Sequence, residues 1–395
     1  MHRTGRWRKS GYIVVTLAVM TLVAACSSSP ASSPAAATSA ASATAAAGGG
    51  SPIKIAIIDA QSGQLSSLGV DEVQGVKLAV DAANAAGGIN GQQIQLQVFD
   101  DKGDPTTSTN VAQAVVSGGY IFVFGTAEST DSMAIAPILE KAQIPMITSG
   151  QADSLANLHD PFMFLNTPTS SAFDQTLADY AVKTKGYKNI ALITNNDSYG
   201  KSEHGAFLAA LQGMSVTPVA DQVVTPDQKD FSAALTSIRQ ANPDVLFIGA
   251  EEVESGLIVN QAKSLGLKAQ IIGGAPIFSV PFLQTAGANA NGCIGTSPYL
   301  GNNTNDNTKA FAAAIAKAYP GVTPDLHQAK AYDGANIVIM ALKQTNGQGG
   351  KALADAIRAT KYNGLVGQFS FDANGVGVHQ TQLGEIQNGQ VVALQ

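Results

Sequence analysis

The sequence predicts an α/β protein made of two doubly wound parallel-sheet halves, and three observations lead to this fold class. Apolar, strand-like runs alternate with segments of helical periodicity from Ile53 onward. Several of these runs, such as IKIAIIDA at 53–60, are almost wholly apolar, which is typical of strands buried on both faces of a parallel sheet. The chain beyond residue 53 is also longer than one hydrophobic core usually serves, so two domains are expected.

In the first half, the spacing of apolar residues decides between helix and strand. Residues 70–86 carry apolar side chains at helical spacing, namely Val73, Val76, Val80 and Ala83. Residues 94–100 instead alternate apolar and polar positions, which predicts a strand. Further helices are predicted at 107–117 and 132–142, and further strands at 121–125 and 145–148.

The second half repeats the same order of elements. Its predicted helices are 171–185, 199–212, 231–240 and 252–265. Its predicted strands are 188–196, 215–223, 243–250 and 269–273. Such repeated strand–helix–strand units indicate parallel sheets covered by helices on both faces.

The N-terminus predicts export and lipidation. Four positive residues lie within the first nine positions, and an apolar stretch of 14 residues follows at 12–25. This stretch has the length of a signal-peptide core, and the LVAAC sequence ending at Cys26 resembles a bacterial lipobox. The resemblance implies that residues 1–25 are removed and that Cys26 is acylated. The alternative is an ordinary signal peptide with a chance cysteine, although the chain has only two cysteines and one falls here.

Residues 26–51 are expected to form a disordered tether, because 27–51 contain only Ser, Ala, Pro, Thr and Gly. Removing residues 1–25 takes four positive charges from a chain of net charge −6, which leaves −10. An acidic body argues against nucleic acid as a partner.

No metal site or cofactor is expected from the cysteines and histidines. Once Cys26 is acylated, Cys293 has no thiol partner, so neither a disulfide nor a thiol metal site follows. No two of the five histidines stand at metal-ligand spacing.

A hydroxyl-rich loop, IFVFGTAESTDSMAIAP at 121–137, joins a predicted strand to a predicted helix. In parallel α/β sheets, ligands bind outside the carboxyl ends of strands, where helix N-termini present free N–H groups. Ser129, Thr130 and Ser132 are therefore candidates for contacts to ligand oxygens. The alternative is that one of these hydroxyls only caps the helix.

An ordered set of segments carries a family resemblance. It includes GVKLAVDAANAAGGINGQQIQLQVFDD, IPMIT, NDSYGKS, QKDFSAAL, PDVLFIGA and QAKSLGLKAQIIG. From about Ile53 to the C-terminus the chain resembles the branched-chain amino-acid-binding proteins of ABC importers, which have the type I periplasmic-binding fold. This fold implies three hinge crossovers, near Thr167–Pro168, Ser297 and Gly367. Lobe 1 would then be 53–168 plus 298–367, and lobe 2 would be 169–297 plus 368–395.

The resemblance implies specific ligand-binding positions. The serine that holds the ligand from lobe 1 falls on Ser129, and a lobe 2 aromatic residue falls on Tyr199. The backbone segment after the fourth strand falls on Gly150, Gln151 and Ala152.

Four positions depart from the family pattern. Ala152 replaces a threonine, Glu251 replaces a second aromatic residue, Ala275 replaces the acid that pairs with the ligand amine, and Leu68 stands where an aromatic residue can occur. Glu251 or Glu128 can replace the missing acid, or the ligand has no ammonium group. Glu251 also has a structural interpretation, as part of a solvated helix start with Glu252 and Glu254. The departures predict weak binding of leucine, isoleucine and valine.

The sequence therefore predicts a binding protein and not an enzyme. GKS at 200–202 lacks the glycine that a phosphate loop needs at position 195, and no other catalytic motif is present. The expected protein is a monomer, lipid-anchored on the outer face of the cytoplasmic membrane, that delivers a small solute to ABC permease subunits. The alternative is a sensor module that signals to a membrane receptor, which neighbouring permease and ATPase genes would argue against.

Overall fold

The computed structural model describes residues 50–301 and 305–394. The predicted signal peptide, Cys26 and nearly all of the predicted tether lie outside the described residues. Within the described ranges, no helix is both long and apolar enough to cross a membrane.

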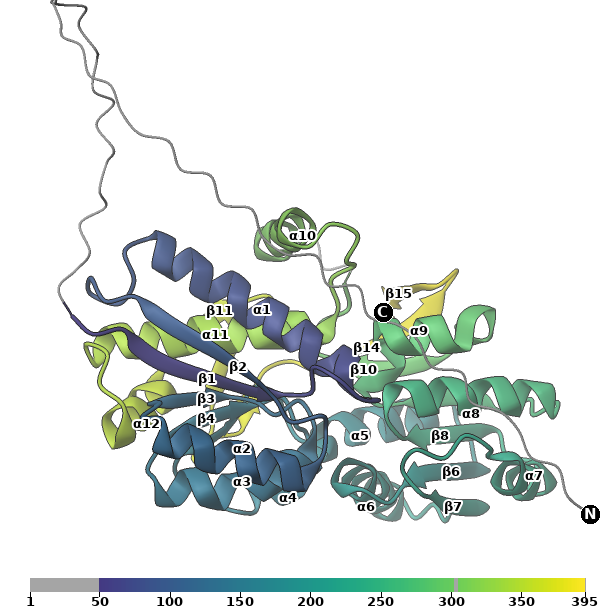
Figure 1. Cartoon of the computed structure of the whole chain (residues 1–395). Coiled ribbons are helices and arrows are strands. Elements are labelled where there is room, and N and C mark those ends of the chain that lie inside the picture. The colour runs from purple at the N-terminus through teal and green to yellow at the C-terminus, as the bar shows by residue number, and fades with distance from the viewer. Residues whose placement is uncertain (1–49, 302–304, 395) are drawn as a thin grey trace, which may run out of the picture. The chain divides into compact units, whose positions relative to one another are not determined.

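The first half of the chain forms a five-stranded parallel sheet with the order β2-β1-β3-β4-β5 (Figure 1). The strands are β1 (Ile53–Asp59), β2 (Ile94–Asp100), β3 (Phe122–Phe124), β4 (Met146–Thr148) and β5 (Met163–Leu165). The helices between them are α1 (Ser66–Ala85), α2 (Pro105–Ser117), α3 (Ser129–Lys141) and α4 (Asp153–Ala156).

Strand β1 shows why both faces of this sheet are covered. Ile55 and Ile57 pack in a cluster with residues of α1 and of α11 (Leu326–Gln344). Ala56 and Ile58 point to the other face and pack with α2 and α3. The near-continuous apolar run that predicted a doubly covered strand is therefore buried on both sides, as expected.

The second sheet has seven strands in the order β15-β14-β10-β9-β8-β6-β7. These are β6 (Ile190–Asn195), β7 (Ala220–Val224), β8 (Val245–Gly249), β9 (Gln270–Gly273), β10 (Ile294–Ser297), β14 (Gln382–Gln387) and β15 (Gln390–Ala393). The first five named are parallel, whereas β14 and β15 add an antiparallel edge. The prediction of a parallel sheet is thus correct for its centre and wrong for this edge.

The helices of this half are α5 (Ser170–Ala178), α6 (Ser198–Gly213), α7 (Ser232–Gln240), α8 (Glu252–Ser264) and α9 (Val280–Ala286). A π-helical segment (Asp179–Thr184) extends α5, and short 3-10 turns lie at Ala275–Phe278 and Gly287–Ala290. The chain then returns to the first sheet through α10 (Asp306–Ala318), α11 and α12 (Gly350–Ala359), and α11 packs along α1. A small antiparallel sheet follows, formed by β11 (Tyr362–Gly364), β12 (Gly367–Phe371) and β13 (Gly377–Val378).

The order of these elements interleaves the two sheets along the chain, as the resemblance implies. Phe369 and Phe371 still pack in the cluster of the first sheet, and the chain enters the second sheet at Gln382. The predicted lobe boundaries themselves stay predictions.

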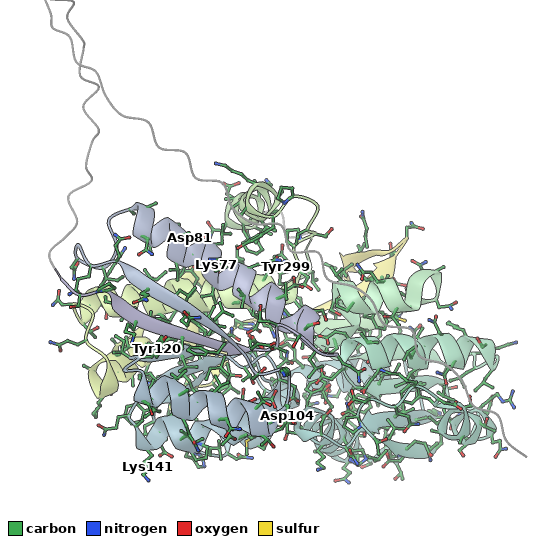
Figure 2. The ribbon with its side chains drawn as sticks, viewed as in Figure 1. Lys77, Asp81, Asp104, Tyr120, Lys141 and Tyr299 are labelled. Atoms are coloured by element: carbon green, nitrogen blue, oxygen red, sulfur yellow. The ribbon has the colours of Figure 1, made fainter. Side chains whose placement is uncertain are left out.

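Helix starts depend on local capping residues. Asp104, labelled in Figure 2, accepts a hydrogen bond from the Thr107 N–H at 2.7 Å, and Pro105 follows as the first helical residue of α2. Helix α3 begins three residues before its predicted start because Glu128 caps it. The predicted strand at 215–223 instead begins at Ala220, after Ser215 has taken a left-handed backbone conformation.

Candidate ligand-binding site

The two sheets share a small cavity of about 20 Å³. Seven of the ten predicted ligand-binding residues line it: Leu68, Ser129, Gly150, Gln151, Tyr199, Glu251 and Ala275. They come from the loops after the carboxyl ends of strands and from the helices that those loops open. The fold therefore brings together residues that the resemblance named, although they lie up to 207 positions apart in the sequence.

Ser129 connects two loops of the first sheet. It is the first residue of α3, and its side chain is 2% exposed. Its Oγ accepts hydrogen bonds from the N–H groups of Gln151 at 3.2 Å and Ala152 at 3.3 Å. The hydroxyl hydrogen remains able to donate toward the cavity. Since Glu128 caps α3, Ser129 is not the helix cap.

The other hydroxyls of this loop bond mainly to one another. Ser132 Oγ lies 2.9 Å from Thr126 Oγ1 and 2.8 Å from Thr148 Oγ1. Thr148 Oγ1 also accepts the Gly150 N–H at 2.9 Å. These hydroxyls therefore hold the loops after β3 and β4 together and do not face a ligand.

Ala152 contributes only its backbone. Its side chain is buried in the core cluster of the first sheet, and it is not among the residues that line the cavity. Its N–H is the group that Ser129 holds.

The second sheet contributes a wall with unpaired polar atoms. Tyr199, in the first turn of α6, is 5% exposed and its hydroxyl has no hydrogen-bond partner. Glu203 lies one turn later and is not among the residues that line the cavity. It is 1% exposed, and its Oε2 is also unpartnered. A Cβ added to Gly274 would lie 2.7 Å from both atoms, so the hydroxyl and the carboxylate converge beside Ala275.

Sequence reasoning missed Glu203, although its position four residues after Tyr199 places both on one face of a helix. Burial is the main cause that raises the pKa of Glu203, to about 7. Ala275 has no acidic side chain, yet a carboxylate approaches the neighbouring Gly274 from α6.

Three ionisable residues of the cavity wall were also missed: Glu252, His327 and Lys330. His327 Nε2 lies 2.8 Å from Glu252 Oε1, which joins α11 to α8. Burial lowers the pKa of His327, but the carboxylates of Glu252 and Glu72 outweigh it and raise the pKa to about 10. Lys330 Nζ donates to the Ser149 carbonyl at 3.3 Å. No sequence motif marks His327 and Lys330, because only the return of α11 to the first sheet brings them here.

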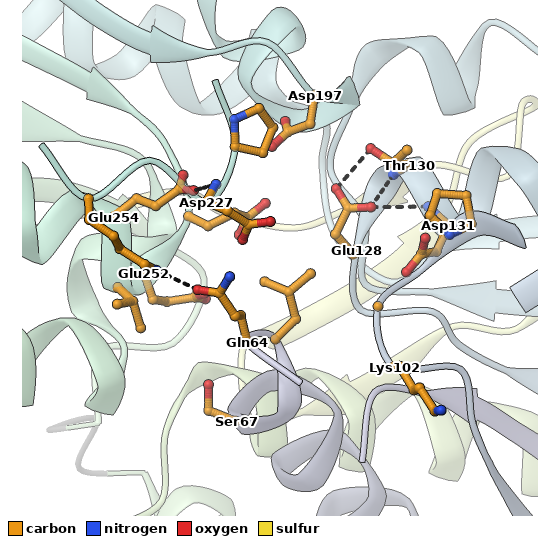
Figure 3. Close-up of a pocket in the computed structure, with 17 residues that line it drawn as sticks. Gln64, Ser67, Lys102, Glu128, Thr130, Asp131, Asp197, Asp227, Glu252 and Glu254 are labelled. Carbon is orange, nitrogen blue, oxygen red and sulfur yellow. Dashed lines mark hydrogen bonds between the residues drawn. The ribbon is translucent and has the colours of Figure 1, made fainter. Parts of the chain in front are cut away.

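A larger cavity of about 330 Å³ lies beside the small one and shares Glu251 and Glu252 with it (Figure 3). The predicted residues Glu128 and Thr130 line this larger cavity. Glu128 accepts hydrogen bonds from the N–H groups of Thr130 and Asp131, drawn as dashed lines in Figure 3. Glu128 is thus held as a helix cap away from the small cavity, whereas Glu251 borders both.

Thr130 joins the two halves of the protein. Its Oγ1 accepts the Ser198 N–H at the start of α6, at 3.1 Å. The same hydroxyl donates to Glu128 Oε1 at 3.2 Å.

Comparison with known proteins identifies the family. The model of a family described as periplasmic binding protein matches residues 52–390. The chain belongs to this family. Leu/Ile/Val-binding protein homolog 3 from Brucella melitensis is 30% identical to this chain, over 67% of this chain and 70% of that protein. The Leu/Ile/Val-binding protein of Escherichia coli is 30% identical over 62% of this chain and 67% of that protein.

Solved structures agree with this assignment. The branched-chain amino-acid transporter substrate-binding protein LivJ from Streptococcus pneumoniae, in complex with isoleucine, matches with a TM-score of 0.79 and 29% identity. The match covers 87% of this chain and all of that one. A solute-binding protein from R. palustris in complex with benzoate matches with a TM-score of 0.81 over 87% of this chain and 95% of that one, but at 21% identity it supports the fold alone.

These findings confirm the resemblance, the type I periplasmic-binding fold with two lobes, and the prediction that the chain is not an enzyme. The chain is a homologue of substrate-binding proteins of branched-chain amino-acid ABC transporters. Membership of this family implies an extracytoplasmic location.

Proposed function

We propose that this protein is the solute-binding lipoprotein of an ABC importer and that it captures a small polar solute by hinge closure. The solute is an amino acid, an amide or a related compound. The observation that carries this proposal is that loops of both sheets meet around the small cavity. At about 20 Å³ it has room for about one water molecule, so these loops must move apart to admit a solute. A solute held there contacts both lobes, so its binding favours the closed arrangement over the open one.

The polar groups of the wall support a solute with at least one oxygen function. The N–H groups of Gly150, Gln151 and Ala152 are already bonded to Thr148 or Ser129. The Ser129 and Tyr199 hydroxyls remain as donors, and Lys330 adds a buried nitrogen. These groups suit a carboxylate or carbonyl oxygen.

A thermal-shift panel of amino acids, amides, aromatic acids and sugars tests the proposal. A true solute at 100 times its dissociation constant stabilises the protein by about 2.7 kcal/mol. The expected result is a rise in melting temperature with one of these chemical classes. A panel without any stabilising solute contradicts the proposal.

Leucine, isoleucine and valine are expected to bind weakly or not at all. Ala275 provides no charged partner for an α-ammonium group, and an ammonium left unpaired in a closed cleft costs several kcal/mol. Calorimetry with leucine measures this directly. Submicromolar binding would contradict the prediction and would point to Glu251, which lines the cavity, or to Glu203 as the group that holds the ammonium.

A further inference from the structure

Three helix starts bring one carboxylate each to a single point of the larger cavity. Glu128 precedes α3, Asp197 precedes α6 and Glu251 precedes α8. One oxygen of each carboxylate lies within 4.8 Å of the other two. Glu128 belongs to the half with the five-stranded sheet, and the other two belong to the half with the seven-stranded sheet.

Helix capping accounts for the positions of Glu128 and Asp197 separately, but it does not account for three carboxylates lying together. Glu128 accepts the N–H groups of Thr130 and Asp131, and Asp197 Oδ1 accepts the Gly200 N–H at 2.7 Å. The Glu251 side chain makes no capping hydrogen bond. A helix N-terminus favours one nearby carboxylate, whereas three ionised carboxylates within 4.8 Å of one another repel each other.

Lysine side chains lie around this cluster, since Lys102 and Lys229 line the same cavity and Lys201 is near Asp197, but none of them forms an ion pair with its carboxylates in the described part of the chain. The ion pairs found in residues 50–301 and 305–394 do not include Glu128, Asp197 or Glu251. Two neighbouring carboxylates of the cavity, those of Glu252 and Glu254, have partners of their own. Glu252 pairs with His327, and Glu254 accepts the Asn195 amide at 2.9 Å.

A fourth carboxylate, that of Asp131, adds a second, independent observation in this cavity. Its side chain lines the cavity and is 2% exposed, yet Oδ1 has no hydrogen-bond partner. Figure 3 shows its carboxylate beside Glu128. A buried carboxylate without a donor is unfavourable unless a proton or a cation neutralises it.

We propose that the larger cavity binds a divalent cation of the calcium type through Glu128, Asp197 and Glu251. Calcium takes 6–8 oxygen ligands at about 2.3–2.6 Å, so two oxygens on one ion lie up to about 5 Å apart. The spacing of the three carboxylates falls within this limit. The surrounding cavity of about 330 Å³ leaves room for the water molecules that complete the coordination. Magnesium, with its shorter and stricter octahedral geometry, fits less well.

The cation links the two lobes, because its ligands come from both. It is a second ligand in addition to the transported solute, and it requires no solute to bind. The sequence expectation of no metal site considered histidines and thiols, whereas these ligands are carboxylates from three distant loops.

Calorimetric titration of the EDTA-treated, full-length protein with calcium chloride tests the proposal, without any solute present. The expected result is one calcium per chain with a dissociation constant of about 0.1–1 mM, as in other extracellular calcium sites. Glu251→Gln and Asp197→Asn should each weaken calcium binding about tenfold or more, since each removes a charged ligand. Both variants should fold, because asparagine also caps helices and Glu251 makes no cap bond.

Asp227→Asn is the matched control. Asp227 lines the same cavity but is not one of the three ligands, and its left-handed backbone conformation also suits asparagine. Its calcium affinity should stay within about twofold of the unchanged protein. Absence of calcium binding up to about 10 mM, or equal affinity in all three variants, overturns the proposal. The solute panel, repeated in EDTA, tests the proposed function separately.

Discussion

At the scale of single residues, Ser129 shows how one hydroxyl serves both structure and binding. Its Oγ accepts two buried N–H groups, and its hydrogen is free to donate to a solute oxygen. Ser129→Ala removes both functions. We expect solute affinity to fall by about 1–3 kcal/mol, which is roughly tenfold to a hundredfold. Calorimetry with the solute found in the panel measures the loss.

Ser132→Ala separates binding from stability. Ser132 is also a fully buried hydroxyl of α3, but it bonds to Thr126 and Thr148 and does not line the small cavity. Ser129→Ala and Ser132→Ala should both lower the melting temperature. Only Ser129→Ala should also lower solute affinity, by about 1–3 kcal/mol. Equal affinities in the two variants would reduce Ser129 to a structural residue.

Glu203 makes stability depend on pH. Its pKa in the folded protein is about 7, raised from the ordinary 4.5 mainly by burial. Between these values the folded state binds more protons than the unfolded state, so stability decreases as pH rises from about 4.5 through 7. Glu203→Gln cannot ionise and should be more stable than the unchanged protein at pH 8, by at most about 3 kcal/mol.

Melting temperatures at pH 5 and pH 8 test this prediction. The gap between Glu203→Gln and the unchanged protein should be small at pH 5 and large at pH 8. Some fall with pH should remain in the variant, because burial also raises the pKa of Asp131 to about 8 and of Asp333 to about 7. A variant that is less stable at pH 8 than the unchanged protein contradicts the assignment.

At the scale of elements, the contact between the starts of α3 and α6 joins the two lobes. Thr130 Oγ1 accepts the Ser198 N–H at 3.1 Å. Thr130→Val keeps the shape of the side chain but removes this acceptor. We expect solute affinity to fall about threefold to tenfold, since one such hydrogen bond contributes about 0.5–1.5 kcal/mol.

Small-angle scattering distinguishes a weaker closed state from a damaged site. The unchanged protein should become more compact with solute, because closure rotates the lobes about the hinge strands. Thr130→Val should need more solute to reach the same compact radius of gyration. A radius that does not change at saturating solute contradicts hinge closure for the unchanged protein itself.

The elements also show what sequence patterns can and cannot predict. The buried run at 53–60 predicted β1 almost to the residue, because a doubly covered strand needs continuous apolar side chains. The start of α3 was predicted too late, since a capping glutamate at 128 is a weaker signal than the serine and threonine after it. The strand predicted from 215 begins five residues later, because the chain turns at Met214–Ser215 and residues 216–218 have no regular secondary structure.

The candidate site also contains residues that could be predicted from the sequence and residues that could not. Ser129, Tyr199 and Ala275 were placed in one cavity by the family resemblance, and hydrophobic periodicity alone could not have joined them. His327 and Lys330 were missed because they reach the cavity only through the packing of α11 along α1. Contacts between elements far apart in sequence carry no local pattern.

At the scale of the whole molecule, attachment to the membrane is expected to depend on one sulfur atom, that of Cys26. The predicted tether from 26 to 51 separates this position from β1, so acylation need not affect the folded body. One acyl chain binds a membrane weakly, but several chains on one residue hold it firmly. Cys26→Ala should therefore move the protein from the membrane fraction to the soluble or secreted fraction.

Cys293→Ala is the matched control, because Cys293 is buried in the core cluster of the second sheet. Its removal leaves a small cavity and lowers stability, but it does not touch the predicted anchor. Fractionation followed by immunoblotting should find Cys293→Ala in the membrane fraction with the unchanged protein. Equal membrane retention of Cys26→Ala would show that the protein is not anchored through this residue.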